Sequence, residues 1–322
     1  MAVTESDVIW AFRTFLGREP ESDAVVREHC GISDLRALCE TMIASTEFCA
    51  RWGRPPSRDS EKDMPNLVLR QSIETSASEQ ELRQLWERVQ RAWVHLGHER
   101  PYQSVLAYDR YAPLRFGESE RQFWESGESE ARRLADYLAD LGGVKLADAV
   151  VVEYGCGVGR VAIPLAAIAG SVVGYDISEP HLKLARLRAA AVGRTNFRAV
   201  AVYDLPNELE PCDVFYSRIV LQHNAPPVIG HLIRTLIRSL RVGGIGLFQV
   251  PTHFHAYRFS VGAALRAPPK MDMEMHCYPQ AEIFSILAQE GAHLIQMRED
   301  DSPDRPDLFV SNMFVLTKVR HR

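Results

Sequence analysis

Short apolar runs alternate with helical patterns over the second half of the chain, from about residue 147 onward. Apolar runs of this length, bounded by turn residues, are typical of buried strands. Helical patterns separate the first six of these runs, which favours parallel pairing of the strands. Only a short acidic loop with prolines separates the last two. We therefore expect an α/β fold with a mostly parallel sheet and an antiparallel hairpin at its C-terminal edge, with strands at 149–154, 171–176, 197–202, 212–217, 244–250, 292–298 and 308–318.

The beginning of the chain has a helical pattern instead. One apolar stripe there consists of Val8, Ile9, Phe12, Phe15 and Leu16. Gly17 is expected to end this helix, and Ser33 is expected to cap a later one, with Asp34 in its first turn. We expect a separate helical module at 1–56, followed by a polar, proline-rich linker at 57–75.

Two amphipathic helices are predicted between the linker and the sheet, at 76–146. Ser78 and Glu81 form a capping box at the start of the first, Gly97 is a natural stop for it, and Gly142 ends the second. The large aromatic side chains of this region need a surface to bury. We expect a helical cover beside the mouth of a ligand site, with the aromatic residues Trp86, Trp93, Tyr102 and Trp124.

Composition and charge narrow the class of protein. The net charge is -5 and the sequence pI is about 6.1, which argues against a dedicated nucleic-acid binder. No apolar run is long enough for a membrane span, and the first residues do not have the pattern of a signal peptide. The six cysteines contain no C-x-x-C pair, so we expect reduced thiols and a cytoplasmic protein without structural zinc.

A glycine-rich turn follows the first predicted strand. Gly155, Gly157 and Gly159 have the spacing G-x-G-x-G, whereas the dinucleotide fingerprint has its third glycine one position later. Glu153 precedes the turn, and a carboxylate there suits a cationic amino group rather than a pyrophosphate. Asp176 ends the second strand, where a carboxylate accepts hydrogen bonds from both ribose hydroxyls. The pattern favours S-adenosylmethionine, which has a ribose and an ammonium group.

These motifs resemble those of the class I S-adenosylmethionine-dependent methyltransferases over about residues 147–318. The resemblance implies a Rossmann-like sheet and an adenine contact near Tyr203 or Asp204, although Asp204 can also simply begin a turn. A plainer alternative is that the glycines only tighten a turn and Asp176 only caps a helix, which leaves Glu153 unexplained. The expected cofactor-binding residues are Glu153, Gly155, Gly157, Gly159, Asp176, Ile177, Tyr203, Asp204 and Ser217.

The acceptor is expected beyond the carboxyl ends of the fourth and fifth strands. Deprotonation of a hydroxyl acceptor benefits from a base, and histidine suits neutral pH. We rank His276 first as this base, with Glu274 close by, and His223 second; a structural hydrogen-bonding role is the alternative for each. The acidic stretch 298–307 is interpreted as a solvated loop; no metal-binding residues are assigned, and the sequence does not determine whether a divalent metal is needed. The expected acceptor-binding residues are Asn224, His253, His255 and Glu274.

Two further resemblances concern the acceptor. The first fifty or so residues resemble a short helical module attached to bacterial glycan-processing enzymes, and motifs of the later region resemble methyltransferases found with bacterial surface-polysaccharide assembly. Both imply O-methylation of a saccharide. Alternatives are a small secondary metabolite or a phosphate terminus as acceptor, and a cofactor-binding scaffold without catalysis. We expect no nucleic acid as partner and no membrane span, and the sequence does not determine the oligomeric state.

Overall fold

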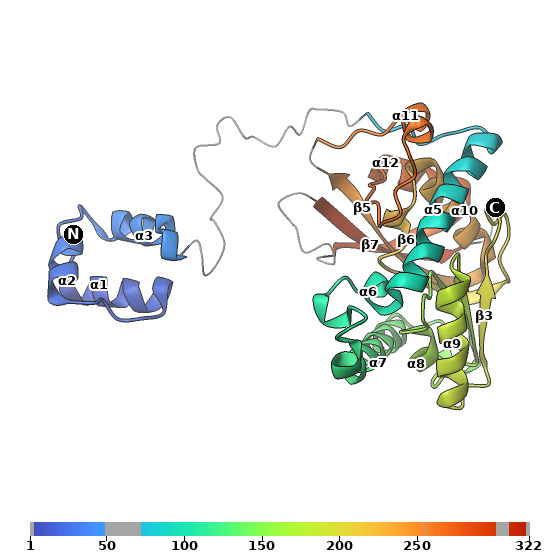
Figure 1. Cartoon of the computed structure of the whole chain (residues 1–322), viewed down its shortest axis with the longest axis horizontal. Helices are drawn as coiled ribbons and strands as arrows, with labels where there is room; N and C mark the ends of the chain where they lie inside the picture. The colour runs from blue at the N-terminus through green and yellow to red at the C-terminus, as the bar shows by residue number, and fades with distance from the viewer. Residues whose placement is uncertain (1–2, 49–71, 255, 301–308, 320–322) are drawn as a thin grey trace. The chain divides into compact units, whose positions relative to one another are not determined.

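The computed structural model describes residues 3–48, 72–254, 256–300 and 309–319 (Figure 1). The chain divides into two compact units, Met1–Arg70 and Gln71–Arg322, and each is described by itself. The predicted linker at 57–75 lies largely outside the described residues. Among the residues that are described, no helix combines the length and the apolar character needed to cross a membrane.

The described part of the first unit includes the short helices α1 (Glu5–Ala11), α2 (Asp23–Cys30) and α3 (Leu35–Ala44), and a π-helical turn, Phe12–Leu16, continues α1. Gly17 ends this turn with φ of 63°, as predicted. Asp34, not Ser33, caps α3: its side chain accepts a hydrogen bond from the Ala37 N–H, so the predicted cap was one residue early. The core of the unit is built from Val8, Phe12, Leu16, Leu38 and Met42.

The second unit is organised around a seven-stranded sheet with the order β3-β2-β1-β4-β5-β7-β6. The first five strands are parallel, and β7 runs antiparallel to both of its neighbours. The prediction of a mostly parallel sheet that ends in an antiparallel hairpin is confirmed. The strands are β1 (Val150–Tyr154), β2 (Ser171–Asp176), β3 (Phe197–Ala201), β4 (Cys212–Ser217), β5 (Leu240–Phe254), β6 (Ala292–Glu299) and β7 (Phe309–Lys318).

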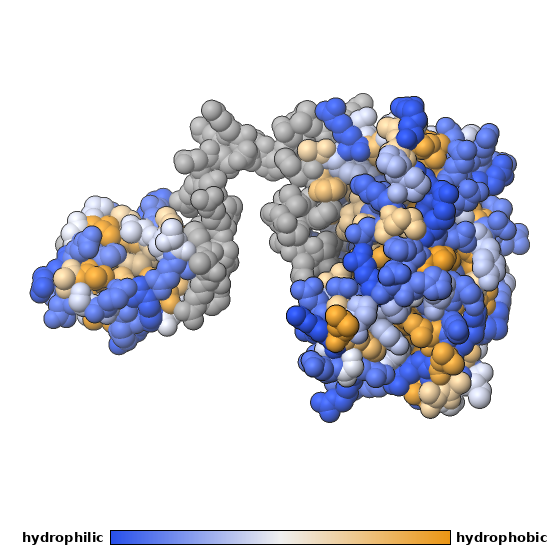
Figure 2. All heavy atoms as spheres, in the orientation of Figure 1, coloured by the Kyte–Doolittle hydropathy of each residue, from blue (hydrophilic) through white to orange (hydrophobic). Residues whose placement is uncertain are grey.

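Helices cover both faces of the sheet, because the central strands are buried at nearly every position and so need a covering layer on each side. One face packs against α10 (Pro226–Ser239), α12 (Gln280–Gln289) and α5 (Glu79–Glu99), while α7 (Phe116–Leu141), α8 (Ala162–Leu165) and α9 (Glu179–Ala191) pack against the other. A short helix, α11 (Val261–Arg266), follows β5. On the side drawn in Figure 2, hydrophobic residues form small separate patches among hydrophilic ones.

One predicted helix is absent. Residues 202–211 connect β3 and β4 without helical structure, because Pro206 and Pro211 interrupt a segment that is already short. The predicted strand at 244–250 was too short: β5 extends to Phe254 because its pairing with β7 continues as far as Phe309.

The region expected to be a cover consists of α5, α6 (Pro101–Val105), a 3₁₀ turn at Asp109–Tyr111 and α7. The Ser78–Glu81 capping box is present, and α7 ends at Gly142 with φ of 68°. The stop predicted at Gly97 was wrong, because α5 continues to Glu99. Gly97 is needed for packing instead: a Cβ there would lie 2.6 Å from Ser178 Oγ and 2.7 Å from His181 Nδ1, at the start of α9. Two further 3₁₀ turns are Leu146–Asp148 and Leu221–His223.

Hydrogen bonds between residues 72–74 and residues 259–261 indicate where the second unit begins. Ser72 O accepts from Phe259 N–H, Glu74 N–H donates to Phe259 O, and the Glu74 carboxylate accepts from Val261 N–H at 2.6 Å. A chain that starts at Met64 keeps these contacts, so we expect its denaturant midpoint and cofactor binding to equal those of the second unit in the full chain. A chain that starts at Glu81 loses them and the cap at Ser78, and should be less stable by roughly 2–3 kcal/mol. A lower midpoint for the Met64 chain would show that the first unit stabilises the second.

Candidate functional site

The turn after β1 requires glycine. Gly155, Gly157 and Gly159 have φ values of 79°, 54° and 80°, a region that other L-residues rarely adopt. The turn is also closely packed, since a Cβ on Gly155 would lie 2.3 Å from Val220 Cγ2 and one on Gly157 would lie 2.8 Å from Val105 Cγ2. The glycines therefore allow the loop both to turn sharply and to contact the cover.

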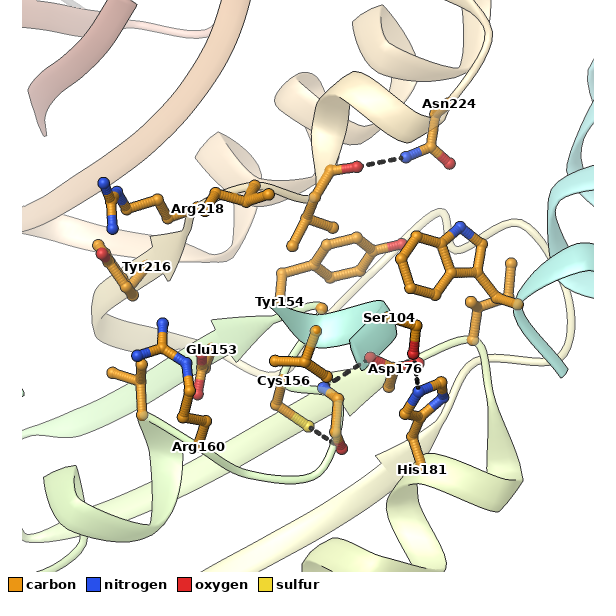
Figure 3. A pocket seen from close by; sticks show the side chains of 18 of the residues that line it. Ser104, Glu153, Tyr154, Cys156, Arg160, Asp176, His181, Tyr216, Arg218 and Asn224 are labelled. Carbon is orange, nitrogen blue, oxygen red and sulfur yellow. Dashed lines mark hydrogen bonds between the residues drawn. The ribbon is translucent and has the colours of Figure 1, made fainter. Parts of the chain in front are cut away.

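A pocket of about 840 Å³ of empty space opens at this loop, beyond the carboxyl ends of β1, β2 and β4 (Figure 3). We call it the glycine pocket. From the cover it is lined by Trp86, Val89, Trp93, Ser104 and Val105, and from the sheet side by Glu153, Gly155, Gly157, Arg160, Asp176, Ile177, Ile219 and Asn224, among others.

Asp176 is held between two backbone groups. Its Oδ2 accepts from Gly157 N–H and its Oδ1 from Ser178 N–H, both at 2.8 Å. Burial raises the pKa of this carboxyl. His181, which sequence reasoning missed, contacts Ser178 Oγ at 2.7 Å and Ser104 Oγ at 2.8 Å, so it joins α9 to the cover.

Glu153 is buried, and its Oε2 has no hydrogen-bond partner within the described part of the chain. Burial raises the pKa of Glu153 to about 8. Figure 3 shows Glu153 and Arg160 on one side of the pocket, and Asp176, Ser104 and His181 on the other. A buried carboxylate oxygen that points into a pocket without a partner fits a cationic ligand group such as the ammonium of S-adenosylmethionine.

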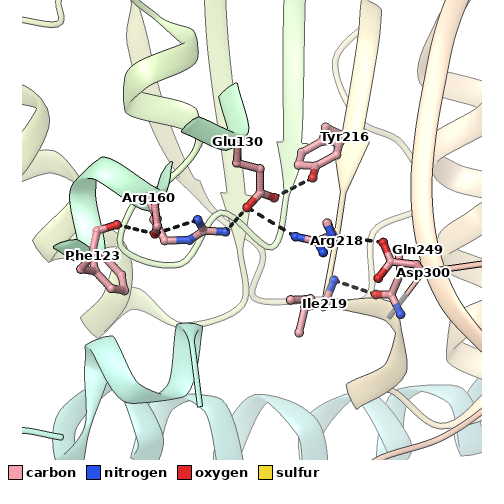
Figure 4. Close-up of polar contacts among 9 residues, drawn as sticks. Phe123, Glu130, Arg160, Tyr216, Arg218, Ile219, Gln249 and Asp300 are labelled. Atoms are coloured by element: carbon pink, nitrogen blue, oxygen red, sulfur yellow. Dashed lines mark hydrogen bonds and ion pairs between the residues drawn. The ribbon is translucent and has the colours of Figure 1, made fainter. Parts of the chain in front are cut away.

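A buried network of charges supports the Glu153 side of the pocket (Figure 4). Glu130 of α7 accepts from Tyr216 Oη and from Arg160 Nη2, both at 2.6 Å, and lies 3.5 Å from Arg218 Nη1. Burial alone would raise the pKa of Glu130, but the charges of Arg160 and Arg218 lower it. Arg218 also pairs with Asp300 at 3.4 Å. This network ties α7 to the glycine loop and to β4.

Sequence reasoning did not assign this network a function. One signal was present: Glu130 lies on the apolar stripe of α7, three residues after Gly127 and four before Leu134. A charged residue at such a position is buried only with a partner.

A second pocket adjoins the first, and the two share Val89 and Trp93. We call it the histidine pocket, because His223 and His276 both line it. Its other walls come from α5, α11 and the segments before and after α11. They include Arg88, Tyr257, Arg258, Phe259, Ser260, Lys270, Asp272 and Glu274.

The two histidines have different surroundings. His223 Nδ1 donates to the backbone oxygen of Glu274 at 2.8 Å, and burial lowers its pKa to about 4. His276 Nδ1 lies 2.7 Å from Tyr257 Oη, and its Nε2 lies 3.3 Å from Glu274 Oε2. His223 is thus a neutral donor to the chain, while His276 contacts two side chains with exchangeable or ionised groups.

The remaining predicted site residues have the following positions. Ile177 lines the glycine pocket, whereas Tyr203 is 62% exposed and neither it nor Asp204 is among the lining residues. Ser217 Oγ donates to Tyr154 O, inside the core. A Cβ on Gly159 would lie 2.7 Å from Ile163 Cδ1, so this glycine serves helix packing.

The residues predicted to bind the acceptor lie farther apart from one another. Asn224 lines the glycine pocket, and its Nδ2 donates to Val220 O at 3.1 Å. His253 is exposed on β5 and lines neither pocket, while His255 lies outside the described residues. Trp86 and Trp93 line the glycine pocket, but Tyr102 and Trp124 pack instead in a cluster with Phe123 and Val158 of the loop.

The acidic stretch 298–307 lies mostly outside the described residues. Within the described ranges, three or more histidine, cysteine, aspartate or glutamate side chains do not come together in a way that could hold a metal ion.

Comparison with known proteins identifies the sheet region. A family described as a methyltransferase domain matches residues 151–244. A ubiquinone biosynthesis O-methyltransferase of Sinorhizobium medicae is 33% identical over 96 residues, which are 30% of this chain and 38% of that protein. The enzyme of the same name from Roseobacter denitrificans is 34% identical over 147 residues, 44% of this chain and 58% of that protein.

The chain therefore spans less than two thirds of the length of these relatives. A solved structure of magnesium protoporphyrin IX methyltransferase from Synechocystis with bound S-adenosylhomocysteine has a TM-score of 0.47 and 18% identity, covering 68% of this chain and 97% of that one. The family match at 151–244 falls on the parallel sheet and on the loop of Gly155, Gly157 and Gly159 between two strand-end carboxylates, so this region is similar to a methyltransferase domain in sequence and in site geometry.

Proposed function

We propose that this protein transfers a methyl group from S-adenosylmethionine to a hydroxyl group of an acceptor bound in the histidine pocket. The observation that carries the proposal is the adjacency of the two pockets, which share Val89 and Trp93. The bound cofactor supplies an electrophilic methyl group on a sulfonium. Alignment of this methyl group with the acceptor oxygen is then chiefly a matter of positioning by the two pockets.

The residues of the glycine pocket have distinct proposed roles. Glu153 pairs with the cofactor ammonium, because its free oxygen is buried there. Asp176 orients the ribose while it holds the loop through Gly157 N–H. Trp93, which lies 5.1 Å from His223 between ring centroids, lines both the glycine pocket and the histidine pocket at their junction. His276 is the proposed base, and His223 holds the Glu274 segment in place.

For the acceptor we propose a sugar hydroxyl. The wall of the histidine pocket combines aromatic side chains with many hydrogen-bonding ones, among them Arg88, Ser260 and Asp272. Aromatic faces together with polar groups suit a polyhydroxylated ring. A phenolic acceptor is the second candidate, because the matched relatives are named ubiquinone biosynthesis O-methyltransferases.

The test is incubation of the full chain with methyl-labelled S-adenosylmethionine and two acceptor panels, fractionated bacterial glycans and simple catechols, followed by mass spectrometry. We expect labelled methyl ethers in the glycan panel. Label only in the catechols would favour the second candidate, and label in neither panel would contradict both. As a control, Asp176→Ala should weaken cofactor binding in calorimetry by roughly 1.5–3 kcal/mol, the range for hydrogen bonds to charged groups.

A further inference from the structure

The side chains of Tyr257, His276 and Glu274 form a chain of three polar groups. The Tyr257 hydroxyl lies 2.7 Å from His276 Nδ1, and His276 Nε2 lies 3.3 Å from Glu274 Oε2. All three side chains line the histidine pocket. Tyr257 follows Ala256, whose φ of 57° is unusual for a residue other than glycine. Such backbone strain persists only where the surroundings enforce it.

The contacts determine the direction in which a proton can move. The hydrogen bond from His276 lowers the pKa of Glu274, so that carboxylate is ionised and accepts from Nε2–H. Nδ1 then carries the lone pair and faces the Tyr257 hydroxyl. Burial raises the pKa of Tyr257, so the phenol is neutral and donates its hydrogen to Nδ1. Proton flow from the pocket through Tyr257 to His276 is the direction that this arrangement allows.

Hydrogen bonds from the sheet and from the loop after β4 hold His276 and Glu274 in place. His276 N–H donates to Gln222 O at 2.8 Å, and the Gln222 side chain accepts from Gln249 Nε2 of β5 at 3.0 Å. His223 fixes the other side through the backbone oxygen of Glu274. Lys270 Nζ lies 4.0 Å from Glu274 Oε1. The three groups are therefore anchored before any acceptor binds.

We propose that Tyr257 is the catalytic residue that receives the acceptor proton and passes its own proton to His276. This inference rests on the proposed methyl transfer to a hydroxyl. The acceptor O–H bond breaks toward Tyr257 Oη while the Tyr257 hydrogen moves to His276 Nδ1. The acceptor oxygen forms its bond to the methyl carbon as the bond between that carbon and sulfur breaks, and the electron pair stays on sulfur. Glu274 stabilises the resulting imidazolium, which later returns its proton to water.

The arrangement can be tested without an acceptor. Two-bond ¹H–¹⁵N correlation spectra of the full chain report which ring nitrogen of each histidine carries hydrogen, and His276→Asn identifies the His276 signals by their loss. We expect neutral His276 to carry its hydrogen on Nε2. Hydrogen on Nδ1 would overturn the proposal, because that nitrogen could then accept nothing from Tyr257. This result does not depend on whether methyl transfer to a hydroxyl occurs.

The kinetic test uses whichever acceptor of the glycan or catechol panel the wild type methylates. Tyr257→Phe should lower kcat by about 10²-fold or more and leave KM and cofactor affinity nearly unchanged. The control is Tyr108→Phe, on an exposed tyrosine outside both pockets, with no expected change. Normal turnover by Tyr257→Phe would overturn the inference. If the wild type methylates neither panel, the proposed function fails while the spectra still decide the arrangement of Tyr257, His276 and Glu274.

Discussion

Replacing Gly127 by alanine should destabilise the second unit by about 3 kcal/mol or more. The added Cβ would lie 1.9 Å from the backbone oxygen of Arg160 and 2.8 Å from its carbonyl carbon, so a rotamer change relieves nothing. Helix α7 must move away from the glycine loop. That movement separates Glu130 from Arg160, and a buried ion pair that loses one partner typically costs about 3–5 kcal/mol.

Gly117→Ala is the matched control, because Gly117 is in the same helix and a Cβ there meets nothing within 4 Å. It should stabilise the protein by up to about 1 kcal/mol, the usual difference between the two residues in a helix. Denaturant midpoints of the two variants and the wild type provide the measurement. Equal midpoints for Gly127→Ala and the wild type would mean that α7 does not pack tightly on the loop.

Glu153→Gln should nearly abolish cofactor binding and at the same time make the protein more stable at alkaline pH. An amide in place of the carboxylate leaves the cofactor ammonium without a counter-charge, and removal of one partner of a buried charged pair costs about 2–5 kcal/mol. Calorimetry with S-adenosylmethionine measures this loss. The control is Glu128→Gln on the exposed face of α7, where Glu128 pairs with Arg132 at 3.4 Å.

The stability gain follows from the sign of the pKa shift. The pKa of Glu153 rises from 4.5 to about 8 on folding, so the folded protein binds more protons than the unfolded chain between these values. The contribution of Glu153 to stability therefore falls as pH rises from 4.5 to 8 and changes no further above 8. Glu153→Gln removes that loss, which is at most about 5 kcal/mol. Unfolding measured at pH 5 and above pH 8 should show a smaller difference for the variant than for the wild type.

Cofactor affinity should change with pH in the opposite sense. The ammonium pairs with ionised Glu153, so affinity of the wild type should rise as pH increases toward 8, by up to about tenfold per unit. The variant should lack this dependence. An unchanged affinity of the wild type over this range would show that Glu153 is already ionised in the free protein.

The strands were predictable because buried parallel strands are nearly continuous apolar runs, and β2 and β4 were predicted to the residue. The glycine turn was predictable because its spacing is local. Gly97 was misinterpreted because a helical glycine needed for packing against Ser178 has the same sequence appearance as a terminal one.

The buried network of charges was harder to predict from the sequence, because Glu130, Arg160 and Arg218 lie in three segments that are far apart along the chain. Sequence separation carries no information about such pairing. Tyr257 was missed for the same reason: its contact with His276 spans nineteen positions and depends on the turn at Ala256.

The position of β7 between β5 and β6 has a consequence for synthesis on the ribosome. Strand β6 emerges first, but among the described strands it pairs with β7 alone, so it has no partner in the sheet until the later strand is made. During that interval one edge of the fifteen-residue β5 is unpaired. Open edges of this kind promote association between nascent chains. Chaperone demand during translation should therefore be concentrated in the period just before β7 leaves the ribosome.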